Sequence, residues 1–532
     1  MSKFYITNAI PYVNAKPHIG HALEFCQSDA IARYHRLIGD DTMFMMGADE
    51  NSLKNVQAAE KAGEKTTDFV SKLTQIFLDL NKELNISNDE FIKTSTLEHF
   101  KGAEKFWGDC DKNGDIYKKS YQGLYCVGCE EFKRESDLIL GEIREGEKVG
   151  YGCCPEHPNS ELQLIEEENY FFKLSRYQKD LEKLIKSGRI KIVPESRKNE
   201  VLSFIKMGLE DFSISRSVER AKGWGVPVPG DDSQVMYVWF DALVNYITGL
   251  GYGEDSEFFK KFWLENKNIL HVIGKGIIKF HAIYWPAMLM SVGIMPENLE
   301  ILAHGYITVN GQKISKSLGN VIDPIEIINK YGTDATRYYL LRAIPTTGDG
   351  DFSFPHFEEI YNADLANGIG NLVSRVLAMS NKYFGGKVSK IQNDPSSHPL
   401  KGAPSLNAWK ESCDEMKKSF ELYKLNDALF FINQFIQSVN IYIDNRKPWV
   451  LAKEGKVEEM AWVLYGLLES IRQLSWMIYP FIPETANKIR EQLGVEKIDE
   501  NNFDFYNEIK WGGLKTGTKI GKIEALFPRI EN

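Results

Sequence analysis

The stretch Pro17-His18-Ile19-Gly20-His21 stands between the first strand and the first helix that the sequence predicts. Residues 3–7 (KFYIT) read as a strand, and apolar residues from 22 to 34 recur at the spacing of a helix. The two histidines therefore fall on the first turn of a helix, where backbone N–H groups and the helix dipole favour a phosphate. Gly20 would let a nucleotide lie close to the backbone. Taken alone, the pattern is equally typical of capping or surface histidines.

A second phosphate-binding pattern lies far downstream, in Lys313-Ile314-Ser315-Lys316-Ser317. It follows a strand-like run at 307–309 and an Asn310-Gly311 turn, so it is expected in a loop. Two lysines and two hydroxyls in such a loop can hold a polyphosphate by charge and by hydrogen bonds. A lone stretch of this kind is more often a solvated loop, but the two patterns together, in this order, are far more specific.

Together, the two patterns resemble the signatures of the class I aminoacyl-tRNA synthetases, and the sequence around them resembles the methionyl-tRNA synthetases. The matching segments run from residue 9 to about residue 455 and read AIPYVNAKPHIGH, YVWFDALVNY, HVIGKGIIKFHAIYWPAML, HGYITVNGQKISKS and RKPWVLAKE. The resemblance implies a ligase that activates L-methionine with ATP to methionyl-adenylate and transfers it to tRNA(Met), releasing AMP and pyrophosphate. It also implies Mg²⁺ bound with the ATP.

Length and composition are those of a soluble globular protein. The chain has 532 residues, 43% hydrophobic and 26% charged, a length that predicts about three or four domains. No apolar run reaches the roughly 18 residues needed to span a bilayer, and the N-terminus reads as neither a signal nor a transit peptide. We therefore expect a cytoplasmic protein with no membrane partner. The net charge of −10 argues mildly against a general nucleic-acid binder, so a tRNA would have to meet local basic patches.

The alternation of strand-like and helix-like segments predicts an α/β fold with a doubly wound, parallel, Rossmann-like sheet. The resemblance adds a connective peptide with a zinc knuckle, inserted in this catalytic domain, and an α-helical bundle that binds the anticodon. The expected units are the first catalytic half (1–115), the connective peptide (116–226), the second catalytic half with the KISKS loop (227–323), a linking stem-contact region (324–355) and the helical anticodon-binding domain (356–532).

Four cysteine and histidine positions in the insertion have the spacing of a zinc site. Cys126 and Cys129 form one pair with two residues between them, and Cys154 and His157 form a second pair with the same spacing. Three thiolates and one imidazole suit one tetrahedral Zn²⁺, and a site with four protein ligands is closed and structural. The alternative is a set of free or redox-active cysteines, and Cys153 competes with Cys154 as the third ligand.

The resemblance assigns roles to three groups of residues in the catalytic halves. The catalytic residues are expected to be His18, His21, Lys313 and Lys316. ATP is expected to contact His18, Gly20, His21, Glu24, Gly274, Lys313, Ser315, Lys316 and Ser317. Methionine is expected in a pocket formed by Ala9, Ile10, Tyr12, Asp49, Trp239, Ala242, Tyr246, Ile277 and His281.

Two segments depart from the family pattern. Asp49 is followed by Glu50-Asn51-Ser52, where the family usually has Glu-His-Gly. Gly276 stands where the family commonly has an aspartate that would be expected to bind the ribose hydroxyls. By resemblance Asp49 holds the substrate amine, although the residue pattern alone is more typical of a helix cap. Aromatic residues at helical spacing, such as Trp239 and Tyr246, are likewise more often part of a core.

In the helical region, the resemblance assigns anticodon reading to Asn371, Arg375 and Trp449. A splayed loop base can stack on an indole and be read by Asn and Arg, although Trp449 can also be interpreted as a core residue. The chain ends where the family's catalytic and helical core ends, so we expect a monomer. The alternatives are another class I synthetase, for leucine, isoleucine, valine or cysteine, and a tRNA-binding or regulatory protein on a scaffold that has lost the activity.

Overall fold

The computed structural model describes residues 2–126, 131–133, 138–139, 152–155, 162–314, 319–391, 404–500 and 502–530. Its centre is a six-stranded sheet in the order β3-β2-β1-β12-β13-β7, in which every neighbouring pair is parallel. The strands are β1 (Lys3–Asn8), β2 (Asp41–Ala48), β3 (Glu90–Lys93), β7 (Ile190–Val193), β12 (Ile269–Gly274) and β13 (Leu299–His304). The strand order reverses between β1 and β12, and ligands bind at the carboxyl ends of strands at such a reversal. The predicted doubly wound fold is confirmed.

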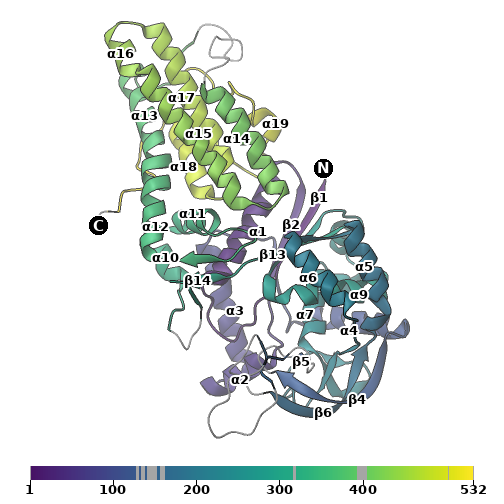
Figure 1. Cartoon of the computed structure of the whole chain (residues 1–532). Coiled ribbons are helices and arrows are strands. Elements are labelled where there is room, and N and C mark those ends of the chain that lie inside the picture. Colours follow the sequence, from purple (N-terminus) through teal and green to yellow (C-terminus); the bar gives the residue numbers. More distant parts are fainter. Residues whose placement is uncertain are drawn as a thin grey trace.

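Helices cover both faces of this sheet (Figure 1). Successive side chains of β1 point to opposite faces, so that Phe4 and Ile6 join one apolar core and Tyr5 joins the other. The first core includes residues of α1 (Ile19–Leu37), α2 (Leu53–Ala62) and α3 (Thr66–Glu83), and the second includes residues of α4 (Leu97–Lys112), α7 (Val238–Thr248) and α9 (Trp285–Ser291). The apolar character of β1 on both faces follows from this double cover.

An antiparallel sheet of four strands lies in the inserted segment. Its order is β5-β4-β6-β8, with strands β4 (Ile116–Cys126), β5 (Glu131–Lys133), β6 (Gln163–Phe172) and β8 (Phe212–Ser213). A smaller sheet of β9 (Ser215–Ser217), β10 (Pro227–Val228) and β11 (Asp231–Met236) follows. Strand β7, between α5 (Gln178–Ser187) and α6 (Glu195–Lys206), falls within the residues predicted for the insertion but pairs with β13 of the central sheet. The domain boundaries themselves stay a prediction.

A hairpin leads into the segment that contains the KISKS pattern. Strands β14 (Ile307–Val309) and β15 (Gln312–Lys313) form it, and β16 (Gly350–Phe352) pairs with β14. Asn310 and Gly311 have φ values of 51° and 74°, as a type I′ turn requires. The turn that the sequence predicted at Asn310-Gly311 is therefore present, and it joins the two strands of this hairpin.

The described chain after this hairpin is largely helical. The helices are α10 (Pro324–Tyr331), α11 (Thr333–Ala343), α12 (Phe354–Ile360), α13 (Asn371–Phe384), α14 (Pro404–Glu421), α15 (Leu425–Arg446), α16 (Pro448–Lys453), α17 (Val457–Ile478), α18 (Pro483–Leu493) and α19 (Phe505–Glu508). The bundle from α13 to α18 lies at the end of the molecule opposite to β4 and β6 (Figure 1). None of the described helices combines the length and apolar character needed to cross a membrane.

A buried cluster of charges around Asp29 ties α1 to the helical region. The fully buried Asp29 carboxylate forms ion pairs with Arg33 at 2.8 Å and with Arg337 of α11 at 2.6 Å. Ser87 donates to it from its backbone N–H at 2.7 Å and from its hydroxyl at 2.6 Å. Burial alone would raise the pKa of Asp29, but the two guanidinium groups and the Ser87 hydrogen bonds hold it at about 2. Asp29 is therefore a permanent anion in the folded chain at neutral pH.

The two arginines extend this cluster into the bundle. Arg33 pairs with Glu500 at 2.6 Å. Arg337 donates to the carbonyl oxygens of Phe481 at 2.8 Å and Pro480 at 3.2 Å, which lie just before α18. Because hydrogen-bonded buried charges tolerate little displacement, the cluster fixes the orientation of α1 relative to the bundle.

Candidate active site

Helix α1 begins directly after His18, and two histidines cap it. The Nδ1 atom of His18 accepts a hydrogen bond from the N–H of Gly20, and the Nδ1 atom of His21 accepts one from the N–H of His18, both at 3.1 Å. A neutral imidazole that accepts at Nδ1 carries its proton on Nε2. Both rings are thereby fixed as Nε2–H donors, with centroids 4.0 Å apart. Burial, and next the neighbouring His18, lower the pKa of His21 well below its usual value, so this donor is neutral.

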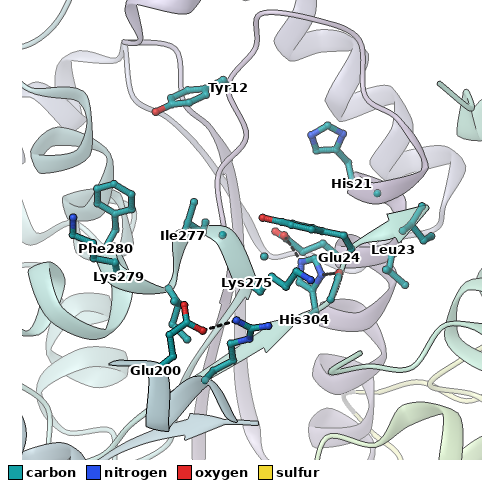
Figure 2. A pocket seen from close by; sticks show the side chains of 18 of the residues that line it. Tyr12, His21, Leu23, Glu24, Glu200, Lys275, Ile277, Lys279, Phe280 and His304 are labelled. Carbon is teal, nitrogen blue, oxygen red and sulfur yellow. Dashed lines mark hydrogen bonds and ion pairs between the residues drawn. The ribbon is translucent and has the colours of Figure 1, made fainter. Parts of the chain in front are cut away.

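The larger of two cavities opens at this helix terminus and has a volume of about 890 Å³. Figure 2 shows His21, Glu24 and Lys275 among the side chains that line it. Five of the predicted ATP contacts are in its lining: His18, Gly20, His21, Glu24 and Gly274. Ser315, Lys316 and Ser317 lie outside the described residues, and Lys313 is described only in its backbone.

A smaller cavity of about 240 Å³ adjoins the first. All nine predicted methionine contacts line it: Ala9, Ile10, Tyr12, Asp49, Trp239, Ala242, Tyr246, Ile277 and His281. Both cavities are lined by Tyr12, His21, Glu24, Trp239, Gly274, Gly276, Ile277 and Tyr306. The two spaces therefore meet beside the first turn of α1, at the reversal point of the central sheet.

The smaller cavity is lined by aromatic rings, and the imidazole of His281 in its wall is neutral. The Nδ1–H of His281 donates to the carbonyl oxygen of Ile277 at 3.0 Å, which leaves Nε2 to accept from the hydroxyl of Tyr246 at 2.7 Å. Burial lowers the pKa of His281 to about 4. Trp239 stacks on Phe280 with ring centroids 3.8 Å apart. The cavity thus offers polarisable ring surface and one ordered pair of polar atoms.

Asp49 brings a buried negative charge to this cavity. The residue follows β2 and is 2% exposed. Its N–H donates to the carbonyl of Pro11 at 2.9 Å, and its carboxylate accepts from the N–H of Asn51 at 3.2 Å. Asp49 and Glu24 are the acidic residues among the described side chains that line the smaller cavity. A buried carboxylate in this position can hold an ammonium group.

Asn51, at one of the two departures from the family pattern, has a structural role. Its side-chain amide donates to the carbonyl of Thr94 and to Oδ2 of Asp241 in α7, both at 2.8 Å. The other carboxylate oxygen of Asp241 lies 2.5 Å from Nε2 of His99 in α4. Asn51 therefore connects the Asp49 segment to the helix that carries Trp239 and Tyr246.

Sequence reasoning assigned no role to two residues that line the larger cavity, His304 and Tyr306. His304 is 2.8 Å from the carbonyl oxygen of Gly305 through Nδ1 and 2.8 Å from Glu24 Oε2 through Nε2, a contact that Figure 2 marks. Both residues directly precede the KISKS hairpin, in the quoted segment HGYITVNGQKISKS. Their position just before the KISKS pattern is the sequence signal that could have identified them.

The three predicted anticodon-reading residues lie on the bundle. Asn371 and Arg375 are one turn apart on α13, and Arg375 pairs with Asp444 in the last turn of α15 at 3.0 Å. Trp449 lies on α16, which directly follows α15, and 38% of it is exposed. It is therefore not the core residue that the alternative interpretation required. Their role in anticodon reading stays a prediction.

Two of the four predicted zinc ligands are described. Cys126 and Cys154 are both fully buried, whereas Cys153 is partly exposed and pairs through its backbone with Ile139. Cys129 and His157 lie outside the described residues. The described ranges contain no group of three acidic, cysteine or histidine side chains that could hold a metal ion, as expected when half of the predicted set is not among them.

Comparison with known families agrees with this geometry. A family model for class I tRNA synthetases (M) matches residues 4–377. The chain belongs to this family. A methionine–tRNA ligase of Thermotoga maritima is 42% identical over 535 residues, covering 99% of this chain and 80% of the relative. A methionine–tRNA ligase of Nostoc sp. is 39% identical over 541 residues, covering 99% of this chain and 97% of the relative.

Solved structures of the family have the same fold. Methionyl-tRNA synthetase of Mycobacterium tuberculosis in complex with methionyl-adenylate superposes with a TM-score of 0.91 at 37% identity, covering 99% of this chain and 100% of the other. The apo form of the Mycobacterium tuberculosis enzyme gives 0.84 at 35% identity, covering 100% and 99%. The likeness thus extends over the catalytic halves, the insertion and the bundle.

Proposed function

We propose that this chain is a methionine–tRNA ligase, which activates L-methionine with ATP to methionyl-adenylate and then transfers the methionyl group to tRNA(Met). The observation that carries the proposal is the pair of adjoining cavities at the reversal point of the sheet. One is small and aromatic with a buried carboxylate, and the other opens at a helix N-terminus with two Nε2–H donors. An amino acid and a nucleotide bound there would meet at the carboxylate and the α-phosphate.

The smaller cavity suits methionine in charge and in surface. Asp49 would hold the ammonium group, since its carboxylate is buried and fixed by the N–H of Asn51. The thioether would lie against the rings of Trp239 and Tyr246, because sulfur packs favourably on aromatic groups. The ordered Tyr246–His281 pair closes the cavity with neutral groups, which discriminates against charged side chains.

Activation needs positioning and charge stabilisation rather than a covalent protein intermediate. The methionine carboxylate attacks the α-phosphorus in line and pyrophosphate leaves. His18 and His21 would donate their Nε2–H groups to phosphate oxygens as charge develops there. Lys313 and Lys316 would neutralise the β- and γ-phosphates and the departing pyrophosphate. Mg²⁺, when bound with ATP, supplies further charge neutralisation at the phosphates.

In the second step the aminoacyl group passes to the 2′-hydroxyl of the terminal tRNA adenosine, as in class I enzymes generally. We propose that Trp449 on α16, together with Asn371 and Arg375 on α13, reads the anticodon loop. Trp449 is exposed on α16 and can stack on a splayed base. Arg375 would exchange its surface pair with Asp444 for a base or phosphate.

We also propose one structural Zn²⁺ in the insertion, held by Cys126, Cys129, Cys154 and His157. Two observations fit this ligand set. Cys126 is buried at the end of β4, and Cys154 is buried while its neighbour Cys153 is not. Thiolates and an imidazole are ligands that Zn²⁺ prefers, and bound Zn²⁺ would cross-link the end of the antiparallel sheet. No step of the reaction depends on it.

The test of the function is amino-acid-dependent ATP–pyrophosphate exchange on the purified full chain with each of the twenty amino acids. Exchange with methionine alone, lost in Lys316→Ala, is the expected result. Lys522→Ala is the matched control, because the Lys522 side chain is 86% exposed and lines neither of the two cavities. Exchange with a different amino acid would overturn the substrate assignment, and no exchange with any amino acid would overturn the activity.

A further inference from the structure

Gly276 and Tyr306 share one small space where the two cavities meet. A Cβ atom built on Gly276 would lie 2.1 Å from the Tyr306 hydroxyl oxygen and 3.4 Å from its Cζ. A contact of 2.1 Å is not possible between non-bonded atoms, so the hydroxyl occupies the place where any side chain at position 276 would start. The glycine at this departure from the family pattern and the position of the tyrosine are therefore linked.

The tyrosine is held in this place by an ion pair beside it. The ammonium group of Lys275 lies 4.7 Å from the centroid of the Tyr306 ring, within cation–π distance. The same ammonium pairs with Asp349 at 2.6 Å, and Asp349 accepts the backbone N–H of Tyr306 at 2.8 Å. The carbonyl of Tyr306 accepts from the N–H of Gly350 at 3.0 Å. The backbone of Tyr306 is thus fixed and its ring lies against a cation, while 43% of the residue stays exposed.

The chemistry of activation places a ribose beside this junction. The adenylate joins the methionine carboxylate to the α-phosphate, and the ribose is attached directly to that phosphate. If methionine occupies the smaller cavity, the carboxylate and the α-phosphate lie where the two cavities meet, and the ribose lies next to them on the side of the larger cavity. Tyr306 and Gly276 line both cavities.

We propose that Tyr306 binds a ribose hydroxyl of ATP, because its own hydroxyl lies beside Gly276 where the two cavities meet. The proposal rests on the proposed function and deepens it. A phenol both donates and accepts a hydrogen bond, so it can pair with a sugar hydroxyl without adding a negative charge beside the triphosphate. It makes Tyr306 a nucleotide-specificity residue of this chain.

The first experiment is Tyr306→Phe in methionine-dependent pyrophosphate exchange, with ATP, 2′-deoxyATP and 3′-deoxyATP as substrates. The KM for ATP should rise by about 3- to 10-fold with little change in kcat, the loss expected for one neutral hydrogen bond. The preference of the wild type for ATP over one of the deoxynucleotides should fall by a similar factor, and the KM for methionine should not change. Tyr506→Phe, at a tyrosine that is 73% exposed on α19, is the matched control.

A second variant tests the shared space without removing the hydroxyl. Gly276→Ala should displace the Tyr306 hydroxyl and reproduce the ATP defect of Tyr306→Phe. In the Tyr306→Phe background the same alanine should add little, since the clashing oxygen is gone and the remaining 3.4 Å contact is tolerable. This non-additivity separates the proposal from a general loss of fold, which would add.

An unchanged ATP KM and unchanged nucleotide preference in Tyr306→Phe would overturn the proposal, as would equal losses for ATP and methionine. Wild-type protein that gives methionine-dependent exchange, alongside such a result, would leave the proposed function standing. Wild-type protein that gives no exchange would remove both.

Discussion

Replacing Asp29 with asparagine removes one buried charge and almost no volume. The substitution leaves Arg337, which is fully buried and whose ion pair among the described residues is with Asp29, without a counter-ion. Removing one partner of a buried pair costs about 3 to 5 kcal/mol. We therefore expect Asp29→Asn to lower the free energy of unfolding at pH 7 by that amount, although it touches no residue of either cavity.

The pH dependence of the unfolding free energy gives a second measure of how much the Asp29 carboxylate stabilises the fold. The pKa of Asp29 is held at about 2, below its value in the unfolded chain, so the unfolded state binds a proton first as the pH falls. The stabilisation is complete above the unfolded pKa near 4 and is lost between about pH 4 and pH 2. Two pKa units correspond to about 2.7 kcal/mol, so the difference in stability between the wild type and Asp29→Asn should narrow by that amount over this range.

The assay is urea unfolding, followed by far-UV circular dichroism and by tryptophan fluorescence, on a double-mutant cycle with Arg337→Met. Arg337→Met leaves Asp29 paired with Arg33, whereas Asp29→Asn leaves the buried Arg337 without a counter-ion. The double variant removes that uncompensated charge. The double variant should therefore be less destabilised than the sum of the singles by more than about 1 kcal/mol. Additive losses, or a loss below about 1 kcal/mol in Asp29→Asn, would refute the reasoning.

Four further predictions concern the functional residues. His18→Asn keeps an oxygen that can cap α1 but lacks the Nε2–H donor, so kcat of exchange should fall by about 100-fold while the free energy of unfolding changes by less than about 1 kcal/mol. His18→Ala should lose both the helix cap and the donor, so that kcat and stability fall together. Tyr246→Phe leaves the buried Nε2 of His281 without its donor, so the KM for methionine should rise by about 5- to 100-fold and the KM for ATP should not; a parallel rise in both would contradict the assignment of the smaller cavity. Trp449→Ala should raise the KM for tRNA(Met) by about 5- to 150-fold in aminoacylation and leave exchange unchanged, and an unaltered KM would remove Trp449 from the anticodon site. Elemental analysis should find one zinc per chain in the wild type and in Cys153→Ser, and none in Cys126→Ser; zinc retained in Cys126→Ser would rule out the proposed ligand set.

The sequence predicted those parts of the site that are encoded locally. His18 and His21 could be placed at a helix start because the strand, the loop and the helix are consecutive in the chain. Asn310-Gly311 could be predicted as a turn because a type I′ turn needs two residues that tolerate positive φ. The family resemblance supplied the methionine contacts, and those that follow β1, β2 and β12 line one cavity because the carboxyl ends of these parallel strands meet at one edge of the sheet.

The features that the sequence did not reveal depend on contacts between distant residues. His304 reaches Glu24 across 280 positions, and no local pattern indicates such a pair. Strand β7 is four residues long and becomes part of the central sheet only through its pairing with β13. In the sequence, Gly276 indicates only that the aspartate common in the family is absent. The structure shows that the Tyr306 hydroxyl fills the space beside this glycine.

The charge cluster at Asp29 also bears on how the chain can be divided. A fragment that stops before α14 would keep Asp29 and Arg337 but lose the carbonyls of Pro480 and Phe481. It would also uncover apolar residues of α1, because the core that begins at Phe4 continues through the bundle. Burying a guanidinium group without its hydrogen-bond acceptors costs free energy of folding. The bundle is therefore not a detachable module: fusion proteins, truncated chains and domain exchanges need to carry α1 and the bundle together.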